Sequence, residues 1–135
     1  VGFGAAAELA QRELDARAAH AKHLRAHLEA ALVRIPGLTL FSALAPRLPN
    51  TSQFAVPGIH SATLLGLLDK QGFAVSSGSA CATGTDEPSP VLLAMGVPPE
   101  LALGAIRVSL GKDNTEVEVD GFVATLREVL DSALA

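Results

Sequence analysis

The feature that most constrains the fold is an uninterrupted helix-forming run near the start of the chain, from about residue 5 to residue 34. Ala, Leu, Glu, Arg and Gln dominate this run, and all of them favour helices. Its apolar positions recur at helical spacing and would face a core. They are Leu14, Ala21, Leu24, Leu28, Leu32 and Ile35. Pro36-Gly37 then ends the helix.

Short strand patterns alternate with further helical segments in the rest of the chain. Strands are predicted at residues 38–41, 51–56, 73–76 and 105–110. Short helices are predicted at residues 62–70, 91–95 and 98–103. Thr115-Glu116-Val117-Glu118 has the pattern of a capping box and would begin a final amphipathic helix. This order predicts an α/β chain of the α+β kind, in which helices cover a small, mainly antiparallel sheet.

Size and composition exclude several classes of protein. The 135 residues fit a single domain, 1–135, or one lobe of something larger. A net charge of −4 gives no electrostatic support for nucleic-acid binding, and no apolar run is long enough for a membrane span. The lone cysteine excludes an internal disulfide and a cysteine-cluster metal site. Without export or disulfide features, a cytoplasmic protein is expected. The opening Val1-Gly2-Phe3 lacks a methionine, which indicates a domain cut from a longer polypeptide.

Cys81 is the strongest candidate for a catalytic residue. It lies in Ser77-Gly78-Ser79-Ala80-Cys81-Ala82, where small neighbours leave the sulfur uncrowded. The alternative is an inert, buried thiol, which is common for free cysteines. Only the thiolate is a good nucleophile, and the nearby Asp86 and Glu87 disfavour that form. Its activation would therefore have to come from elsewhere in the fold.

Arg107 is the second candidate, within the strand pattern at 105–110. Alternation puts Arg107 and Ser109 on one face of that strand. The opposite face would carry Ile106, Val108 and Leu110. If the Arg107 face opens on a cleft, the planar guanidinium suits a substrate carboxylate. The alternative is an ordinary exposed arginine.

Two other sets of polar residues have simpler interpretations. His20, His23 and His27 lie near one helical face, and three imidazoles can bind zinc. No cysteine or carboxylate completes that set at a convincing spacing, so we expect no metal site and a helix face exposed to solvent. Asn50 precedes a strand and is expected to form a turn, with a ligand contact as the alternative.

Several of these segments together resemble the C-terminal part of group I cysteine desulfurases, which are pyridoxal-phosphate enzymes related to the class V aminotransferases. The resemblance extends over nearly the whole chain, and the cysteine motif with its spacing to the arginine strand is its most specific part. The matching segments are Val75-Ser76-Ser77-Gly78-Ser79-Ala80-Cys81, Glu87-Pro88-Ser89, Ala105-Ile106-Arg107-Val108-Ser109-Leu110-Gly111 and Arg47-Leu48-Pro49-Asn50-Thr51.

The resemblance implies a role for each candidate residue. The chain would be the small C-terminal domain of an enzyme that converts L-cysteine to L-alanine, with the large cofactor-binding domain absent from it. Cys81 would attack the substrate sulfur and hold it as a persulfide, while Arg107 and Asn50 would bind the substrate. The parent enzyme would be a homodimer that passes sulfur to an acceptor such as an iron–sulfur scaffold protein.

The lysines limit what this chain can do alone. Pyridoxal phosphate would need a Schiff-base lysine, and none of Lys22, Lys70 and Lys112 has a context like the family's cofactor-binding lysine. That lysine is therefore expected upstream, and the isolated chain is expected to bind no cofactor and to be inactive. Two alternatives remain open: a persulfide carrier or protein-interaction module that works without a cofactor, and a homologue resembling selenocysteine lyase.

Overall fold

The computed structural model describes residues 1–77 and 87–134, and within them five helices surround a four-stranded sheet. The sheet has the order β1-β2-β4-β3 and every neighbouring pair is antiparallel, which confirms the predicted fold class. In chain order the elements are α1 (Gly2–Leu32), β1 (Thr39–Leu40), β2 (Thr51–Ala55), α2 (Ser61–Lys70), β3 (Ser76–Ser77), α3 (Pro90–Ala94), α4 (Pro99–Leu103), β4 (Ala105–Ser109) and α5 (Glu116–Leu134).

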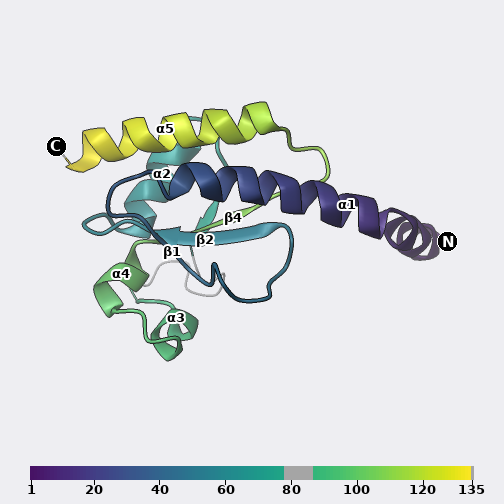
Figure 1. Cartoon of the computed structure of the whole chain (residues 1–135), viewed down its shortest axis with the longest axis horizontal. Helices are drawn as coiled ribbons and strands as arrows, with labels where there is room; N and C mark the ends of the chain where they lie inside the picture. The colour runs from purple at the N-terminus through teal and green to yellow at the C-terminus, as the bar shows by residue number, and fades with distance from the viewer. Residues whose placement is uncertain (78–86, 135) are drawn as a thin grey trace.

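The two faces of the sheet are covered unequally. Figure 1 shows α1, α2 and α5 on one side of the sheet and the short helices α3 and α4 on the other. Alternate residues of β2 and β4, such as Phe54 and Ile106, are buried under the three longer helices in the larger core. The opposite face carries a smaller core under α3 and α4. That smaller core consists of Phe41, Ala55, Leu92, Ala102 and Ala105.

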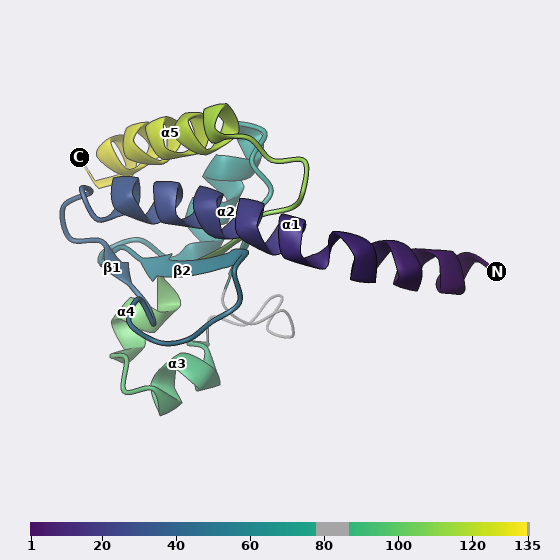
Figure 2. The same cartoon turned by 45° about the vertical axis from the view of Figure 1, so that its right-hand side comes forward.

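Helix α1 extends well beyond the sheet. Its N-terminal part projects from the body of the molecule (Figure 2), and the first buried residue along it is Ala21. Leu14 was expected to face a core, and this prediction was wrong, because its side chain is 62% exposed. The helical period is correct, but the sheet that α1 covers ends before this turn of the helix.

The sheet is shorter on the β3 side than the sequence predicts. The strand expected at residues 73–76 is only Ser76–Ser77. Phe73 instead packs edge-to-face on Phe122 of α5, with the ring centroids 5.5 Å apart. Residues 73–75 do not pair with β4, and together with Val108 and Leu110 they line a cavity of about 370 Å³.

Local chemistry fixes where β4 and α5 begin. Gly104 precedes β4 at a close backbone approach, since an added Cβ would lie 2.7 Å from the Ile59 carbonyl oxygen. The capping box of α5 forms as predicted. The Thr115 N–H donates to Glu118 Oε2 at 2.8 Å, and the Glu118 N–H donates to Thr115 Oγ1 at 3.3 Å.

In the described part of the chain, no helix is both long enough and apolar enough to cross a membrane.

Candidate functional site

A row of polar side chains crosses the sheet on the face opposite the larger core, which we call the open face because these side chains are half-buried rather than buried. Arg107 of β4 lies between Gln53 of β2 and Ser76 of β3, because the register pairs both residues with it. Directly opposed residues of antiparallel strands project from the same face. We call Gln53, Arg107 and Ser76 the polar row.

The predicted orientation of Arg107 is confirmed. Ile106, Val108 and Leu110 are buried in the larger core, so Arg107 and Ser109 alternate onto the other face. Arg107 is half-buried, and its Nη2 donates a long hydrogen bond of 3.5 Å to Ser76 Oγ. Among residues 1–77 and 87–134, this is the only hydrogen bond that the Arg107 side chain makes.

Arg107 differs from the other half-buried arginines in what balances its charge. Arg17 contacts Glu13, and both Arg25 and Arg47 contact Glu29. Within residues 1–77 and 87–134, no carboxylate forms an ion pair with Arg107. A partly desolvated guanidinium without a counter-charge is costly, and its planar fork is suited to an incoming carboxylate.

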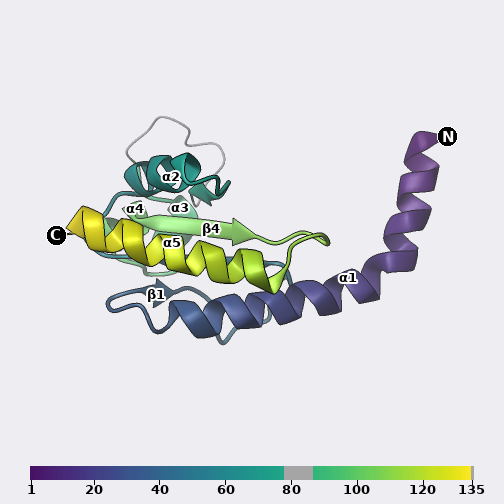
Figure 3. The same ribbon diagram turned by 90° about the horizontal axis from the view of Figure 1, so that it is seen from above.

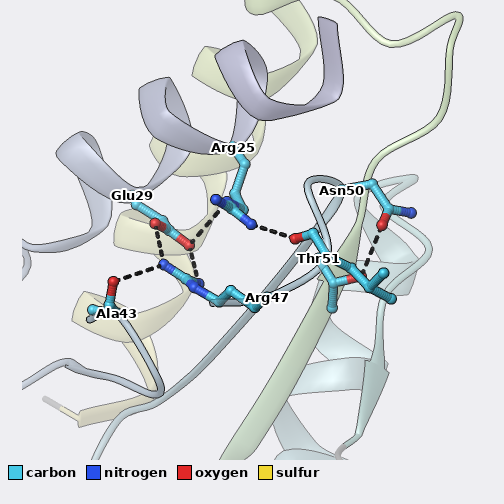
Figure 4. Close-up of polar contacts among 7 residues, drawn as sticks. Arg25, Glu29, Ala43, Arg47, Asn50 and Thr51 are labelled. Atoms are coloured by element: carbon cyan, nitrogen blue, oxygen red, sulfur yellow. Dashed lines mark hydrogen bonds and ion pairs between the residues drawn. The ribbon is translucent and has the colours of Figure 1, made fainter. Parts of the chain in front are cut away.

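The Arg25–Glu29–Arg47 cluster holds the segment that leads into β2 (Figure 4). Arg47 binds Glu29 through two hydrogen bonds, of 2.6 Å and 2.9 Å, and Arg25 Nη1 donates to the Leu48 carbonyl oxygen. The three charged side chains are only 14–16% exposed. This cluster joins α1 to the loop before Thr51 and so fixes the position of β2.

Asn50 lies at the end of that loop and not in the polar row. Its Oδ1 accepts a hydrogen bond from Thr51 Oγ1 at 3.3 Å, and its carbonyl oxygen accepts one from the Leu110 N–H at 2.8 Å. It lines a cavity of about 270 Å³ that also includes residues of α1 and Lys112. Along the β2–β4 register, Asn50 is three residues, or roughly 10 Å, from the level of Arg107. The structure does not bring these two predicted substrate ligands together.

Cys81 falls in residues 78–86, outside the described residues. The chain enters that segment from β3, whose Ser76 and Ser77 pair with Arg107 and Ile106. After the segment, Ser89 is buried and directly precedes α3. Cys81 is thus four residues along the chain from the strand beside Arg107.

The three histidines of α1 contact α5 and the loop before it at a solvent-accessible edge. The side chain of His23 is 66% exposed and that of His27 is 37% exposed, as expected for a solvent-facing helix face, and only the partners were not foreseen. Figure 3 shows α1 and α5 side by side. His20 Nε2 contacts the Asn114 carbonyl oxygen at 2.9 Å, and the rings of His23 and His27 contact Glu116 and Asp120. Among the described residues no group of three or more His, Cys, Asp or Glu could hold a metal ion.

Every lysine of the sequence lies on the surface of the described structure. Lys22 is on α1, Lys70 ends α2, and Lys112 follows β4. All three side chains are exposed. They belong to separate elements, and none joins the polar row.

Sequence reasoning missed Gln53 and Ser76 as members of the site. Their own sequence positions carry little signal, since each is one of several polar residues in its short strand. Strand pairing is what places them beside Arg107, and pairing depends on register rather than on composition. Alternation around Phe54 would have put Gln53 on the open face, but not opposite an arginine.

Comparisons with known proteins show the family to which the chain belongs. The profile of the family described as aminotransferase class V matches residues 1–122. A cysteine desulfurase of Gluconacetobacter diazotrophicus is 42% identical over 137 residues, which cover 96% of this chain and 34% of that protein. A cysteine desulfurase of Klebsiella pneumoniae is also 42% identical, over 97% of this chain and 33% of that protein.

A solved structure shows the same fold. The X-ray structure of a NifS-like protein from Rickettsia africae superimposes with a TM-score of 0.84 at 32% identity. The match covers 96% of this chain and 33% of that one. The chain therefore spans about one third of the length of the relatives that it matches.

Proposed function

Because this chain belongs to the class V aminotransferase family, we propose that it provides the persulfide-forming and carboxylate-binding part of a cysteine desulfurase. In the overall reaction L-cysteine and the Cys81 thiol give L-alanine and a Cys81 persulfide. The C–S bond of the substrate breaks and an S–S bond forms to Cys81. The electron pair of the broken bond stays with carbon, which takes up a proton. The terminal sulfur then passes to an acceptor thiol.

The observation that carries this proposal is the state of Arg107. It is half-buried, it projects from the open face of the sheet, and no carboxylate in the described part of the chain balances its charge. An α-amino acid brings a planar carboxylate that two parallel N–H groups of a guanidinium can bind. We assign Arg107 to the α-carboxylate of L-cysteine.

The connectivity of the chain supports the role of Cys81. Cys81 follows Ser77 by four residues, and four residues span at most about 14 Å. Ser77 in turn pairs with Ile106, next to Arg107. A substrate held by Arg107 therefore lies within the range that the Cys81 sulfur can reach. The assignment of Asn50 as a second substrate contact stays a prediction.

Pyridoxal phosphate, on which the family generally depends, does not fit the residues of this chain. Schiff-base lysines are desolvated in their sites. Lys22, Lys70 and Lys112 are all exposed and lie on separate elements. We therefore place the anchoring lysine, and the domain that carries it, outside residues 1–135. The sulfur acceptor, such as an iron–sulfur scaffold protein, and a homodimeric assembly belong to the same proposal.

The test is the rate of alanine release from L-cysteine by the natural protein that carries this sequence, supplied with pyridoxal phosphate. Arg107→Gln should lower kcat/KM by roughly 10- to 100-fold, since a charged hydrogen bond contributes about 1.5–3 kcal/mol. Arg127→Gln is the matched control, because Arg127 is exposed on α5. An unchanged kcat/KM in a folded Arg107→Gln variant would contradict the proposal.

A further inference from the structure

Gln53 occupies the position in the sheet that most directly affects Arg107. The register places their Cα atoms opposite each other on β2 and β4, and both side chains are half-buried on the open face. Directly opposed side chains of antiparallel strands have Cβ atoms about 4.5–5.5 Å apart. The Gln53 amide is therefore within reach of the Arg107 guanidinium. In the described residues its side chain forms no hydrogen bond of its own.

Beyond Gln53, on the side away from Arg107, the surface is hollowed. A cavity of about 240 Å³ is lined by Phe41, Ser42, Arg47, Leu48, Thr51 and Gln53. The charge of Arg47 in that lining is already held by Glu29. Gln53 thus lies between Arg107, whose charge no carboxylate among the described residues balances, and a hollow that can take the rest of a small ligand.

The chemistry of an amide suits this place better than that of a carboxylate. Its Oε1 accepts a hydrogen bond from a guanidinium N–H, and its Nε2 can donate to a ligand oxygen. Because the amide is neutral, it orients Arg107 without consuming the positive charge. A glutamate here would pair with Arg107, as Glu13 and Glu29 pair with the other half-buried arginines.

From this arrangement we infer that Gln53 is a positioning residue for Arg107 and that the pair selects substrates bearing an α-carboxylate. This inference rests on the proposed function of Arg107. When a substrate carboxylate binds, Gln53 Oε1 accepts a hydrogen bond from the guanidinium and so orients it, and Gln53 Nε2 offers the carboxylate a further donor. Its neutrality keeps the site open to an anionic ligand.

The test is steady-state kinetics of the natural protein with Gln53→Glu. The introduced carboxylate should compete with the substrate, raising KM for L-cysteine about tenfold or more, with kcat within about twofold. The melting temperature should be unchanged or higher, because opposite charges on paired strands attract. Gln71→Glu makes the same change at the exposed end of α2 and should leave KM unaltered.

A second variant keeps the result decisive if Gln53→Glu does not fold. Gln53→Met preserves the length of the side chain and removes the amide, and should raise KM about threefold to tenfold. An unchanged KM in either folded variant overturns the inference. If Arg107→Gln lowers kcat/KM while the Gln53 variants do not, only the role of Gln53 fails. If Arg107→Gln has no effect, the proposed function fails as well.

Discussion

Arg107 and Arg47 are both half-buried arginines, but only Arg47 has a carboxylate partner among the described residues. Two nitrogens of Arg47 donate hydrogen bonds to Glu29, so the charge of Arg47 is balanced and its side chain is oriented within the fold. Arg107 has a serine and a glutamine as its cross-strand neighbours, which can orient a guanidinium without neutralising it. A neutral setting of this kind is what a ligand-binding arginine needs.

Glu118 gives a prediction at the same scale. The hydrogen bond from the Thr115 backbone N–H, helped by the side chains of Asn114 and Thr115, lowers the pKa of Glu118. A carboxyl group with a lowered folded-state pKa stabilises the fold above its unfolded pKa, about 4.3 for glutamate, and this contribution is lost as pH falls through the folded value. The melting temperature of Glu118→Gln should therefore fall less steeply with decreasing pH than that of the wild type.

The measurement is thermal unfolding of the wild type and the variant at a series of pH values from neutral to strongly acidic. Glu128→Gln is the control, since Glu128 is exposed on the same helix and outside the capping box. The control should keep the wild-type pH dependence. Equal slopes for the wild type and Glu118→Gln would show that the capping box contributes no pH-dependent stability.

The residues that sequence alone could assign are those whose neighbours along the chain decide their environment. The face of Arg107 follows from the period of two in β4, and the capping box follows from a four-residue pattern. Gln53 and the histidines of α1 could not be assigned this way. Their partners are far away in sequence, as with His20 and Asn114, and only the packing of strands and helices brings them together.

At the scale of elements, the loop that leads into β2 is held by charges rather than by its own regular structure. Glu29 on α1 binds Arg47 of this loop, and Arg25 on α1 binds the Leu48 carbonyl. The segment has no repeating hydrogen-bond pattern, so the sequence predicts only a proline-rich connection there. The helices were predictable from propensity and caps, whereas strand lengths depended on competing packing, as Phe73 shows.

Glu29→Gln tests this attachment. The side chains of Arg25 and Arg47 are only 14% and 16% exposed. The change leaves both of these largely buried guanidinium groups without their counter-charge. The free energy of unfolding should fall by roughly 2 kcal/mol. Denaturant unfolding of the variant measures this loss.

Glu13→Gln is the matched control for that experiment. It removes a more exposed pair, since Glu13 and Arg17 are 36% and 37% exposed and lie one helical turn apart. An i,i+4 pair of this kind contributes about 0.3–0.5 kcal/mol. Equal losses for the two variants would mean that the Arg25–Glu29–Arg47 cluster does not hold the loop before β2.

For the whole molecule, the sheet aligns the side chains that we assign to carboxylate binding beside the start of the cysteine segment. The antiparallel strands β2, β4 and β3 align Gln53, Arg107 and Ser76. Strand β3 leads directly to the segment that contains Cys81. The three longer helices cover the opposite face, so the polar row shares its face of the sheet with the short helices α3 and α4. The chain spans about a third of the length of its desulfurase relatives, and the exposure of its three lysines supports the proposal that the cofactor anchor lies outside it.

The most direct test of this account is to detect sulfur on Cys81. The natural protein that carries this sequence is incubated with L-cysteine and pyridoxal phosphate, then alkylated and digested. The mass of the peptide that contains Cys81 is measured by mass spectrometry. We predict a peptide heavier by one sulfur atom, absent without L-cysteine and reduced in Arg107→Gln at low substrate concentration. An unmodified Cys81 thiol while alanine accumulates at its normal rate, or normal turnover by Cys81→Ser, would contradict the account.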